Sequence, residues 1–374
     1  MQKTTQLVRA GLPQPPTKLR PGDPIHPGPV FASAFAAPGD PASSPYTYTR
    51  FNNPTWRELE HALGLLEGGI ARIFPSGMAA VTAVFAALLR PGDTVVLPSD
   101  SYYTTRIIMR EFFAGFGIQT RLAPTANNAQ AEVLAGAKLL WIETPANPGM
   151  DVCDIRLLTE VAHRHGLLVA VDNTTPTALG QQPLALGADI SVASDTKSLT
   201  GHSDLVLGHV AVKDPALDAK IERWRRLSGS IVGPMEAWLA MRSLATLPLR
   251  LEKQSQNALA IAEFLERQPM VRAVHYPGLK SHPAHVLAVS QMQFFGPVVG
   301  FELPDRPAAE RFLQASHLLV EASSFGGIVS SAERRARWGG DDVTEGFIRL
   351  SAGCEAIEDI LADLDQALRA SESL

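Results

Sequence analysis

The sequence predicts an α/β protein with a mostly parallel central sheet and a smaller C-terminal α+β domain. Two observations support this prediction. Between residues 94 and 193, apolar runs of four or five residues, each bounded by turn residues, alternate with helical stretches. Strands buried on both faces of a parallel sheet read as continuous apolar runs, and helices form the right-handed crossovers between them. The length of 374 residues is enough for two or three domains.

The N-terminal segment has an unusual composition, because ten of the 28 prolines fall in the first 45 residues. Proline has no backbone N–H to donate, so this segment is expected to be neither a regular helix nor a central strand. Composition leaves two possibilities, a disordered tail or an extended arm that lies on another surface.

The elements of the predicted sheet domain follow in order. Apolar residues recur at helical spacing from Trp56 to Leu66, and Gly68 and Gly69 end that helix. Ser76 and Gly77 precede an apolar helix that stops at residues 90–92. The predicted strands are 94–97, 138–142, 167–171 and 190–193, with a helix over 155–165. Ligands of such sheets bind at the carboxyl ends of the strands, so the residues directly after each strand are the first candidates for a site.

The second half predicts fewer and shorter strands. One long helix is expected from about residue 234 to residue 265, followed by strands over 271–275, 298–302 and 347–350 and a final helix over 356–370. This order is typical of a smaller α+β domain that begins at the long helix.

Composition excludes several classes of protein. The formal net charge of −5 argues against nucleic-acid binding through a basic face. The longest apolar stretch, over 78–89, is shorter than the ~20 residues of a membrane span, and the N-terminus has no apolar core of a secretory signal. Two cysteines fit a reducing compartment. We therefore expect a cytoplasmic protein with no nucleic-acid or membrane partner.

Lys197 is the first candidate for chemistry. It follows the strand over 190–193 and lies between the hydroxyl side chains of Ser194 and Thr196 and a Gly-His pair. A lysine in a partly desolvated pocket loses basicity and can form a Schiff base with an aldehyde, while neighbouring hydroxyls can bind a phosphate. Pyridoxal phosphate carries both groups. A solvated lysine in a surface turn is the alternative interpretation.

Three further candidates follow other predicted elements. Asp172 comes at the end of the strand over 167–171. A carboxylate there could keep the pyridine nitrogen of a cofactor protonated, and the alternative is an ordinary cap of the next helix. Gly77 lets an anion approach a helix N-terminus, although Ser76 also fits a plain N-cap. Tyr102 could stack on a planar cofactor or be an ordinary interfacial aromatic. No cluster of zinc type accompanies the histidine pairs 163/165 and 282/285, which are expected at the surface.

Taken in chain order, these segments resemble the Cys/Met-metabolism pyridoxal-phosphate enzymes of fold type I, from about Tyr46 to about Leu368. The most specific motif is Ser-x-Thr-Lys-x-x-x-Gly-His-x-Asp, over 194–204. Six further motifs occur in the family's order: Tyr-x-Arg-x-x-Asn-Pro-Thr over 48–55, Ser-Gly-Met-Ala-Ala over 76–80, Glu-Thr-Pro-x-Asn-Pro over 143–148, Val-Asp-Asn-Thr over 171–174, His-Tyr-Pro-Gly-Leu over 275–279 and Arg-Leu-Ser-x-Gly-x-Glu over 349–355.

The resemblance implies a fold type I transferase architecture and a role for each matching residue. Lys197 would hold pyridoxal phosphate through its amine and then move protons between substrate carbons. Asp172 would pair with the ring nitrogen, and Tyr102 would stack on the ring and assist the leaving thiol. The cofactor's phosphate would be bound by Gly77, Met78, Ser194 and Thr196.

The resemblance also implies a substrate site and an assembly. Arg349 would grip the substrate α-carboxylate, with Asn147 and Ser324 nearby. Tyr48 and Arg50 would reach the phosphate in the neighbouring subunit, so residues 1–52 become an extended arm that lies on a partner. We expect a homotetramer of catalytic dimers, a cofactor domain over 53–240 and a C-terminal domain over 241–374.

The implied function is cystathionine γ-lyase-like elimination at the γ-carbon of a sulfur amino acid, which gives cysteine, 2-oxobutanoate and ammonia. A γ-synthase acting on an O-acyl-homoserine, a methionine γ-lyase and a pyridoxal-binding scaffold without activity are the alternatives. Two departures from the family bear on this choice: Tyr103 and Thr104 replace two glycines after Tyr102, and a basic segment over 330–340 replaces a His-Pro segment. The first adds bulk to the loop over the cofactor, and the second borders the substrate side and so affects the choice of substrate.

Overall fold

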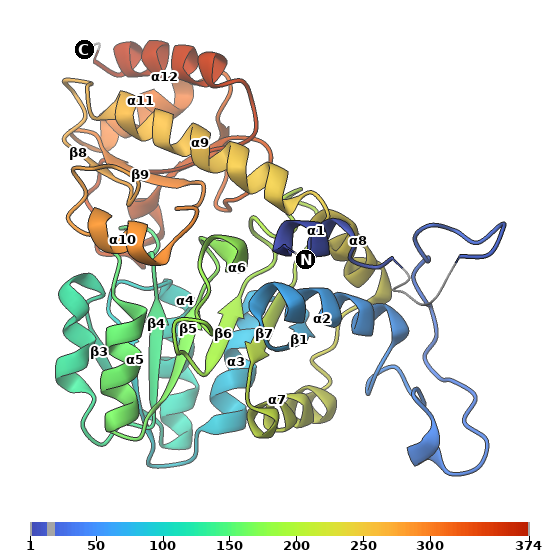
Figure 1. Ribbon diagram of the computed structural model, residues 1–374. Coiled ribbons are helices and arrows are strands. Elements are labelled where there is room, and N and C mark those ends of the chain that lie inside the picture. The colour runs from blue at the N-terminus through green and yellow to red at the C-terminus, as the bar shows by residue number, and fades with distance from the viewer. Residues whose placement is uncertain (1, 13–18, 373–374) are drawn as a thin grey trace.

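The computed structural model describes residues 2–12 and 19–372, and its larger sheet has seven strands (Figure 1). The spatial order is β1-β7-β6-β5-β4-β2-β3. Strands β3, β2, β4, β5 and β6 are parallel, whereas β7 is antiparallel to both β6 and β1. The predicted, mostly parallel sheet is therefore confirmed, although β1, β3 and β7 were not among the predicted strands. The bounds are β1 (Ile70–Phe74), β2 (Thr94–Pro98), β3 (Gln119–Ala123), β4 (Leu139–Glu143), β5 (Leu168–Asp172), β6 (Ile190–Ala193) and β7 (Gly208–Val212).

Helices cover both faces of this sheet. Along β4, Leu139 and Trp141 belong to the core with α3 (Gly77–Leu88), α4 (Tyr103–Glu111) and α7 (Pro215–Ser228). Leu140 and Ile142 belong to the core with α5 (Ile155–Arg164) on the other face. Successive side chains of a strand point to opposite faces, which is why residues 139–142 of β4 are all apolar.

Side-chain caps define where several helices begin. Ser76 Oγ accepts the N–H of Ala79 at 3.0 Å and starts α3. Asn53 caps α2 (Pro54–Glu67) in the same way, and Gly68, at φ 76°, ends it in the left-handed conformation that glycine adopts without strain. These caps confirm the predicted start of the apolar helix and the predicted end of the helix before it.

A second, five-stranded sheet has the order β10-β11-β12-β9-β8. It packs on helices α9, α11 and α12 around a separate apolar core, as predicted for a smaller α+β unit (Figure 1). The bounds are β8 (Ala273–His275), β9 (Val298–Glu302), β10 (Val320–Glu321), β11 (Ser331–Arg334), β12 (Phe347–Ser351), α9 (Leu247–Leu265), α11 (Arg306–Ala315) and α12 (Ile357–Glu372). The shorter helical elements are α6 (Thr177–Gly180), α10 (His285–Gln291), η1 (Pro41–Ser43), η2 (Phe113–Phe116), η3 (Ala126–Val133) and η4 (Arg335–Trp338).

Three sequence expectations were wrong. The single helix over 234–265 is two helices, α8 (Pro234–Leu244) and α9, because Pro248 has no N–H to continue a helix and suits the first turn of a new one. The N-terminal segment contains a regular helix, α1 (Lys3–Val8), which precedes the first proline and buries Leu7 in the core. His282 is buried, and its Nδ1 accepts the N–H of Ala284, whereas His163 is exposed as expected.

The rest of the described N-terminal segment is largely extended and leaves the body of the molecule before it returns to α2 (Figure 1). Within residues 2–12 and 19–372, no helix is long and apolar enough to cross a membrane, and no group of three or more His, Cys, Asp and Glu side chains could hold a metal ion.

Candidate active site

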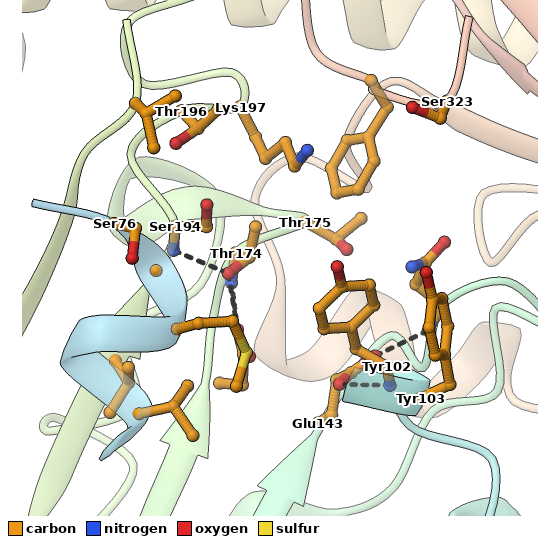
Figure 2. Close-up of a pocket in the computed structure, with 18 of the residues that line it drawn as sticks. Ser76, Tyr102, Tyr103, Glu143, Thr174, Thr175, Ser194, Thr196, Lys197 and Ser323 are labelled. Carbon is orange, nitrogen blue, oxygen red and sulfur yellow. Dashed lines mark hydrogen bonds between the residues drawn. The ribbon is translucent and has the colours of Figure 1, made fainter. Parts of the chain in front are cut away.

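A cavity of about 280 Å³ lies where β4, β5 and β6 end, and it gathers most of the predicted site residues (Figure 2). The strand ends, the first turn of α3 and the second sheet all contribute to its lining. Nine of the predicted residues are there: Gly77, Met78, Tyr102, Asn147, Asp172, Ser194, Thr196, Lys197 and Arg349. This is the edge of the sheet at which α/β proteins bind ligands.

Lys197 lies in the turn after β6 and points into this cavity. Its Nζ donates to Ser324 Oγ at 3.0 Å and lies 5.1 Å from the centre of the Phe325 ring. Burial, together with the nearby Arg349 guanidinium, lowers the pKa of this amine to about 8, while Glu333 opposes the shift. The amine is thus much closer to its neutral, nucleophilic form at neutral pH than an exposed lysine would be.

Asp172 ends β5 and is held by a threonine two residues later. Thr174 donates to Asp172 Oδ1 from its hydroxyl at 2.6 Å and from its backbone N–H at 3.1 Å. The same hydroxyl oxygen accepts the N–H of Ser194 at 2.9 Å, which links the ends of β5 and β6. Burial raises the pKa of the Asp172 carboxyl against these hydrogen bonds, so a cationic partner in the cavity would stabilise its ionised form.

Glu143 faces the same space from β4 and was not predicted as a site residue. It pairs in register with Asp172 and accepts the N–H groups of Tyr102 and Asn147, each at 2.9 Å. Its pKa is well above the usual value because of burial and the neighbouring Asp172. Glu143 therefore fixes the backbone of two predicted site residues that lie on different loops. Its position at the end of an apolar run was the signal that would have identified it.

The end of the cavity at α3 is closely packed. A Cβ atom on Gly77 would lie 2.5 Å from Ser194 Cβ, and one on Gly208 would lie 2.7 Å from Gly77 N. Only glycines let these three segments approach so closely, and the approach leaves the N–H groups at the start of a 12-residue helix directed at the cavity.

The hydroxyl groups at this end of the cavity differ in whether their hydrogen is already used in a hydrogen bond within the chain. Thr196 Oγ1 donates to Leu207 O at 3.1 Å and accepts the N–H of Leu207 at 3.0 Å, so its hydrogen is engaged within the chain. Ser76 Oγ accepts the N–H of Ala79, which leaves its hydrogen for an anion. Ser76 lines the cavity and was predicted only as a helix cap.

Arg349, on β12, marks the opposite end of the cavity. Its Nη1 donates to Asn147 Oδ1 at 2.9 Å, and its Nη2 binds the carbonyl oxygens of Ser323 and Ser324 and the carboxylate of Glu333. Burial lowers the pKa of this guanidinium to about 10, so it remains charged at neutral pH. A fixed, buried guanidinium suits the two-point binding of a carboxylate.

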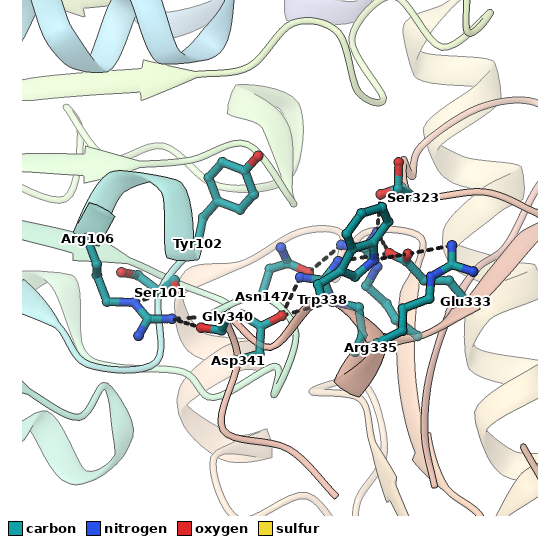
Figure 3. A network of polar contacts seen from close by, with 12 residues as sticks. Ser101, Tyr102, Arg106, Asn147, Ser323, Glu333, Arg335, Trp338, Gly340 and Asp341 are labelled. Carbon is teal, nitrogen blue, oxygen red and sulfur yellow. Dashed lines mark hydrogen bonds and ion pairs between the residues drawn. The ribbon is translucent and has the colours of Figure 1, made fainter. Parts of the chain in front are cut away.

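Glu333, which binds Arg349, belongs to a polar network that the sequence did not predict (Figure 3). Glu333 is fully buried and accepts from Arg335 Nη1 at 2.9 Å and from Trp338 Nε1 at 2.7 Å. Arg335 also pairs with Asp341, which lies 3.8 Å from Arg106. The basic segment over 330–340 is therefore largely neutralised, and Arg335 and Trp338 line the cavity.

Tyr48 and Arg50 do not line the cavity of their own chain. Arg50 Nη1 donates to the carbonyl of Arg226 at 2.6 Å, near the end of α7, and Tyr48 is 43% exposed. Ser324 contacts the cavity residues Lys197 and Arg349 without being part of the lining itself.

The residues of the cavity fit pyridoxal phosphate. A buried lysine of lowered pKa suits its aldehyde, a buried carboxylate without a cation suits its pyridine nitrogen, and a glycine-lined helix N-terminus suits its phosphate. The three groups line one cavity, with Tyr102 among them.

Comparison with known proteins agrees with this fit. Residues 4–369 match the model of the family described as Cys/Met metabolism PLP-dependent enzyme. A Streptomyces coelicolor protein named "Putative cystathionine gamma-lyase" is 54% identical over 97% of this chain and 93% of its own length. A cystathionine gamma-synthase of Mycobacterium tuberculosis is 40% identical over 91% of each chain.

A solved structure agrees as well. The cystathionine gamma synthase of Xanthomonas oryzae pv. oryzae in complex with cystathionine superposes with a TM-score of 0.94 at 35% identity, covering 100% of this chain and 99% of the other. The family match over nearly the whole chain, the relatives and the shared fold agree with the chemistry of the cavity. The chain therefore belongs to the Cys/Met-metabolism family of pyridoxal-phosphate-dependent enzymes.

Proposed function

We propose that this enzyme acts as a cystathionine γ-lyase: it cleaves the Cγ–S bond of cystathionine and, with one water, releases cysteine, 2-oxobutanoate and ammonia. The observation that carries the proposal is the single cavity in which Lys197, Asp172, Tyr102 and Arg349 meet. The name of the 54% identical relative from Streptomyces coelicolor supports the choice of reaction.

Pyridoxal phosphate, when bound, supplies an aldehyde for the substrate amine and a ring that withdraws the electrons left at Cα after proton loss. Asp172, with Thr174 donating to it, would keep a proton on the ring nitrogen and so maintain that electron withdrawal. The N–H groups of Gly77 and Met78 and the hydroxyl groups of Ser76 and Ser194 would bind the phosphate.

The substrate would be oriented by its α-carboxylate on Arg349, with Asn147 beside it. The Lys197 amine, whose pKa of about 8 is close to neutrality, would take the Cα proton and pass it on to replace the proton that Tyr102 gives to the sulfur. It would then take a Cβ proton and return it to Cγ once the sulfur has left. The Tyr102 hydroxyl would donate a proton to the departing sulfur. Water would then hydrolyse the remaining enamine to 2-oxobutanoate and ammonia.

The assembly we propose is a homotetramer of catalytic dimers in which the segment over 1–52 lies on a neighbouring subunit. Within one chain Tyr48 is 43% exposed and lies outside the cavity, which supports a role for Tyr48 and Arg50 at a partner's site. We also propose a cytoplasmic location and retain residue 240 as the boundary between the two domains.

The test is an assay of purified protein with cystathionine, methionine and O-acetyl-homoserine plus cysteine, in which each 2-oxo acid and thiol product is identified. Cystathionine γ-lyase activity predicts 2-oxobutanoate and cysteine from cystathionine. Formation of cystathionine from O-acetyl-homoserine as the main reaction would favour the γ-synthase instead. Lys197→Ala should abolish both the cofactor's absorbance band and all turnover, and retained turnover in that variant would sink the proposal.

A further inference from the structure

Trp338 forms part of the outer wall of the cavity near Arg349. It lies at the end of η4, lines the cavity and is 49% exposed. Glu333 defines its place, because one oxygen of this carboxylate accepts from Trp338 Nε1 at 2.7 Å and the other binds Arg349. The indole therefore lies at the Arg349 end of the cavity, away from the end formed by α3.

The half-exposed indole is held from two sides. Its N–H donates to Glu333, which is fully buried, and the guanidinium of Arg337 lies 5.1 Å from the centre of its ring. Arg337 is itself paired with Glu333 at 3.2 Å. Outward rotation of the ring would remove a donor from a buried carboxylate and break the cation–π contact, so the ring is expected to stay in place.

The turn that follows Trp338 is fixed against another part of the chain. A Cβ atom on Gly340 would lie 2.7 Å from Tyr103 Cγ, and Arg106 Nη2 donates to Gly340 O at 3.0 Å. Tyr103 and Arg106 belong to α4, beside the larger sheet. The wall that carries Trp338 is thus anchored on both sides of the cavity (Figure 3).

We propose that Trp338 determines the size of the γ-substituent that the enzyme accepts, an inference that rests on the γ-elimination proposed above. Every amino-acid substrate would present the same amine to the cofactor's aldehyde and the same α-carboxylate to Arg349, so the γ-substituent is the part that remains to meet the outer wall. A rigid wall rejects an oversized group, and one methylene in a fixed pocket changes selectivity by about 10- to 200-fold.

The experiment compares two ligands that differ only in the γ-substituent. They are S-butyl-homocysteine, whose substituent is smaller than the cysteinyl group of cystathionine, and S-(2-naphthylmethyl)-homocysteine, whose substituent is larger. The holoenzyme is titrated with each, and apparent Kd values come from the change in cofactor absorbance, with kcat/KM measured in parallel. The wild type should bind S-butyl-homocysteine more tightly. In Trp338→Ala the ratio of the two Kd values should fall at least about tenfold. In Val329→Ala, which changes an exposed residue outside the cavity lining, the ratio should be unchanged.

Two results would overturn the proposal: a wild type that does not discriminate between the ligands, or a Trp338→Ala variant that keeps the wild-type ratio within twofold while its cofactor spectrum is normal. If Trp338→Ala does not retain the cofactor, Trp338→Leu decides by the same criterion. Failure of the proposed reaction is a separate result. If the wild type does not cleave cystathionine, but the ratio of the two Kd values falls about tenfold in Trp338→Ala, the result refutes the proposed reaction and supports the role of Trp338.

Discussion

A buried triad of ionisable residues, Glu67, Asp195 and His209, offers a quantitative test of this structure. His209, on β7, is 1% exposed in its side chain and lies between two buried carboxylates. Its Nδ1 is 2.6 Å from Asp195 Oδ1, and its Nε2 is 2.9 Å from Glu67 Oε1. Asp195 stands between two cavity residues, Ser194 and Thr196. We predict that His209→Gln destabilises the protein strongly, because it leaves two buried carboxylates without a cation.

The magnitude follows from the pKa of the imidazole. The two carboxylates raise this pKa from 6.5 to about 10 despite burial, which acts in the opposite direction. A pKa raised by folding stabilises the folded state fully below pH 6.5, and this contribution is lost as pH rises through 10. At pH 7 the folded-state pKa lies about three pH units higher, and at ~1.4 kcal/mol per unit the imidazolium contributes about 4 kcal/mol to the free energy of unfolding. The cost of His209→Gln should therefore fall by about 1.4 kcal/mol per pH unit between pH 6.5 and 10.

The assay is urea-induced unfolding followed by tryptophan fluorescence, at fixed protein concentration and saturating cofactor, at pH 6.5, 7.5 and 8.5. The matched control is His163→Gln, which removes an exposed His–Asp189 pair of the same 2.9 Å length and should cost less than about 1 kcal/mol. A cost of His209→Gln below about 1 kcal/mol at pH 6.5, or a cost that does not change with pH, would refute the assignment of a buried imidazolium.

Three further predictions concern the cavity. Gly77→Ala places a Cβ 2.5 Å from Ser194 Cβ, and it should raise the Kd for pyridoxal phosphate about tenfold or more in titrations of the cofactor-free protein. Gly115→Ala is the control, because open space surrounds Gly115 and the Kd should not change. Equal Kd values for the two variants would contradict a phosphate site at the start of α3. Arg349→Lys keeps a charge but loses the planar fork, so KM should rise about 10- to 100-fold with a smaller change in kcat, and a pure kcat effect would argue against carboxylate binding. Because burial lowers the pKa of Lys197 to about 8, the neutral amine becomes more populated as pH rises through this value. The rate at which the cofactor-free protein takes up pyridoxal phosphate should therefore increase from pH 7 to 9, with a midpoint near 8. A rate that does not change over this range would contradict the assignment of this amine to Lys197.

The cofactor end of the site was predictable from the sequence because its residues follow directly from local pattern. Lys197 and Asp172 come after apolar runs that read as parallel strands, and parallel strands end at one edge of the sheet. Gly77 follows the serine that caps the apolar helix. In each case a few neighbouring residues carry the whole signal. Glu143 ends its strand in the same way, directly after an apolar run, so the same local signal applies to it.

The long-range polar groups were not predictable in this way. Glu67, Asp195 and His209 come from three segments, and 142 residues separate the first from the last. Glu333 meets Arg349 only because β11 and β12 pair antiparallel, with the two residues opposite each other in the register, and Trp338 is linked to Arg349 through Glu333. No periodicity in the sequence relates such residues, since their contact depends on how the sheets are assembled.

By itself, the sequence determined the α/β class, the carboxyl edge of the sheet as the site, and the lysine, aspartate and glycine that suit pyridoxal phosphate, because strand burial, helix capping and motif spacing are local properties. Only the tertiary structure decided that helix formation breaks between α8 and α9, that the basic segment over 330–340 is neutralised by Glu333 and Asp341, and that Trp338 lines the cavity together with Arg349. These features arise where distant segments are brought together and their charges buried, and the energy of a buried charge depends on which partners lie within hydrogen-bond distance.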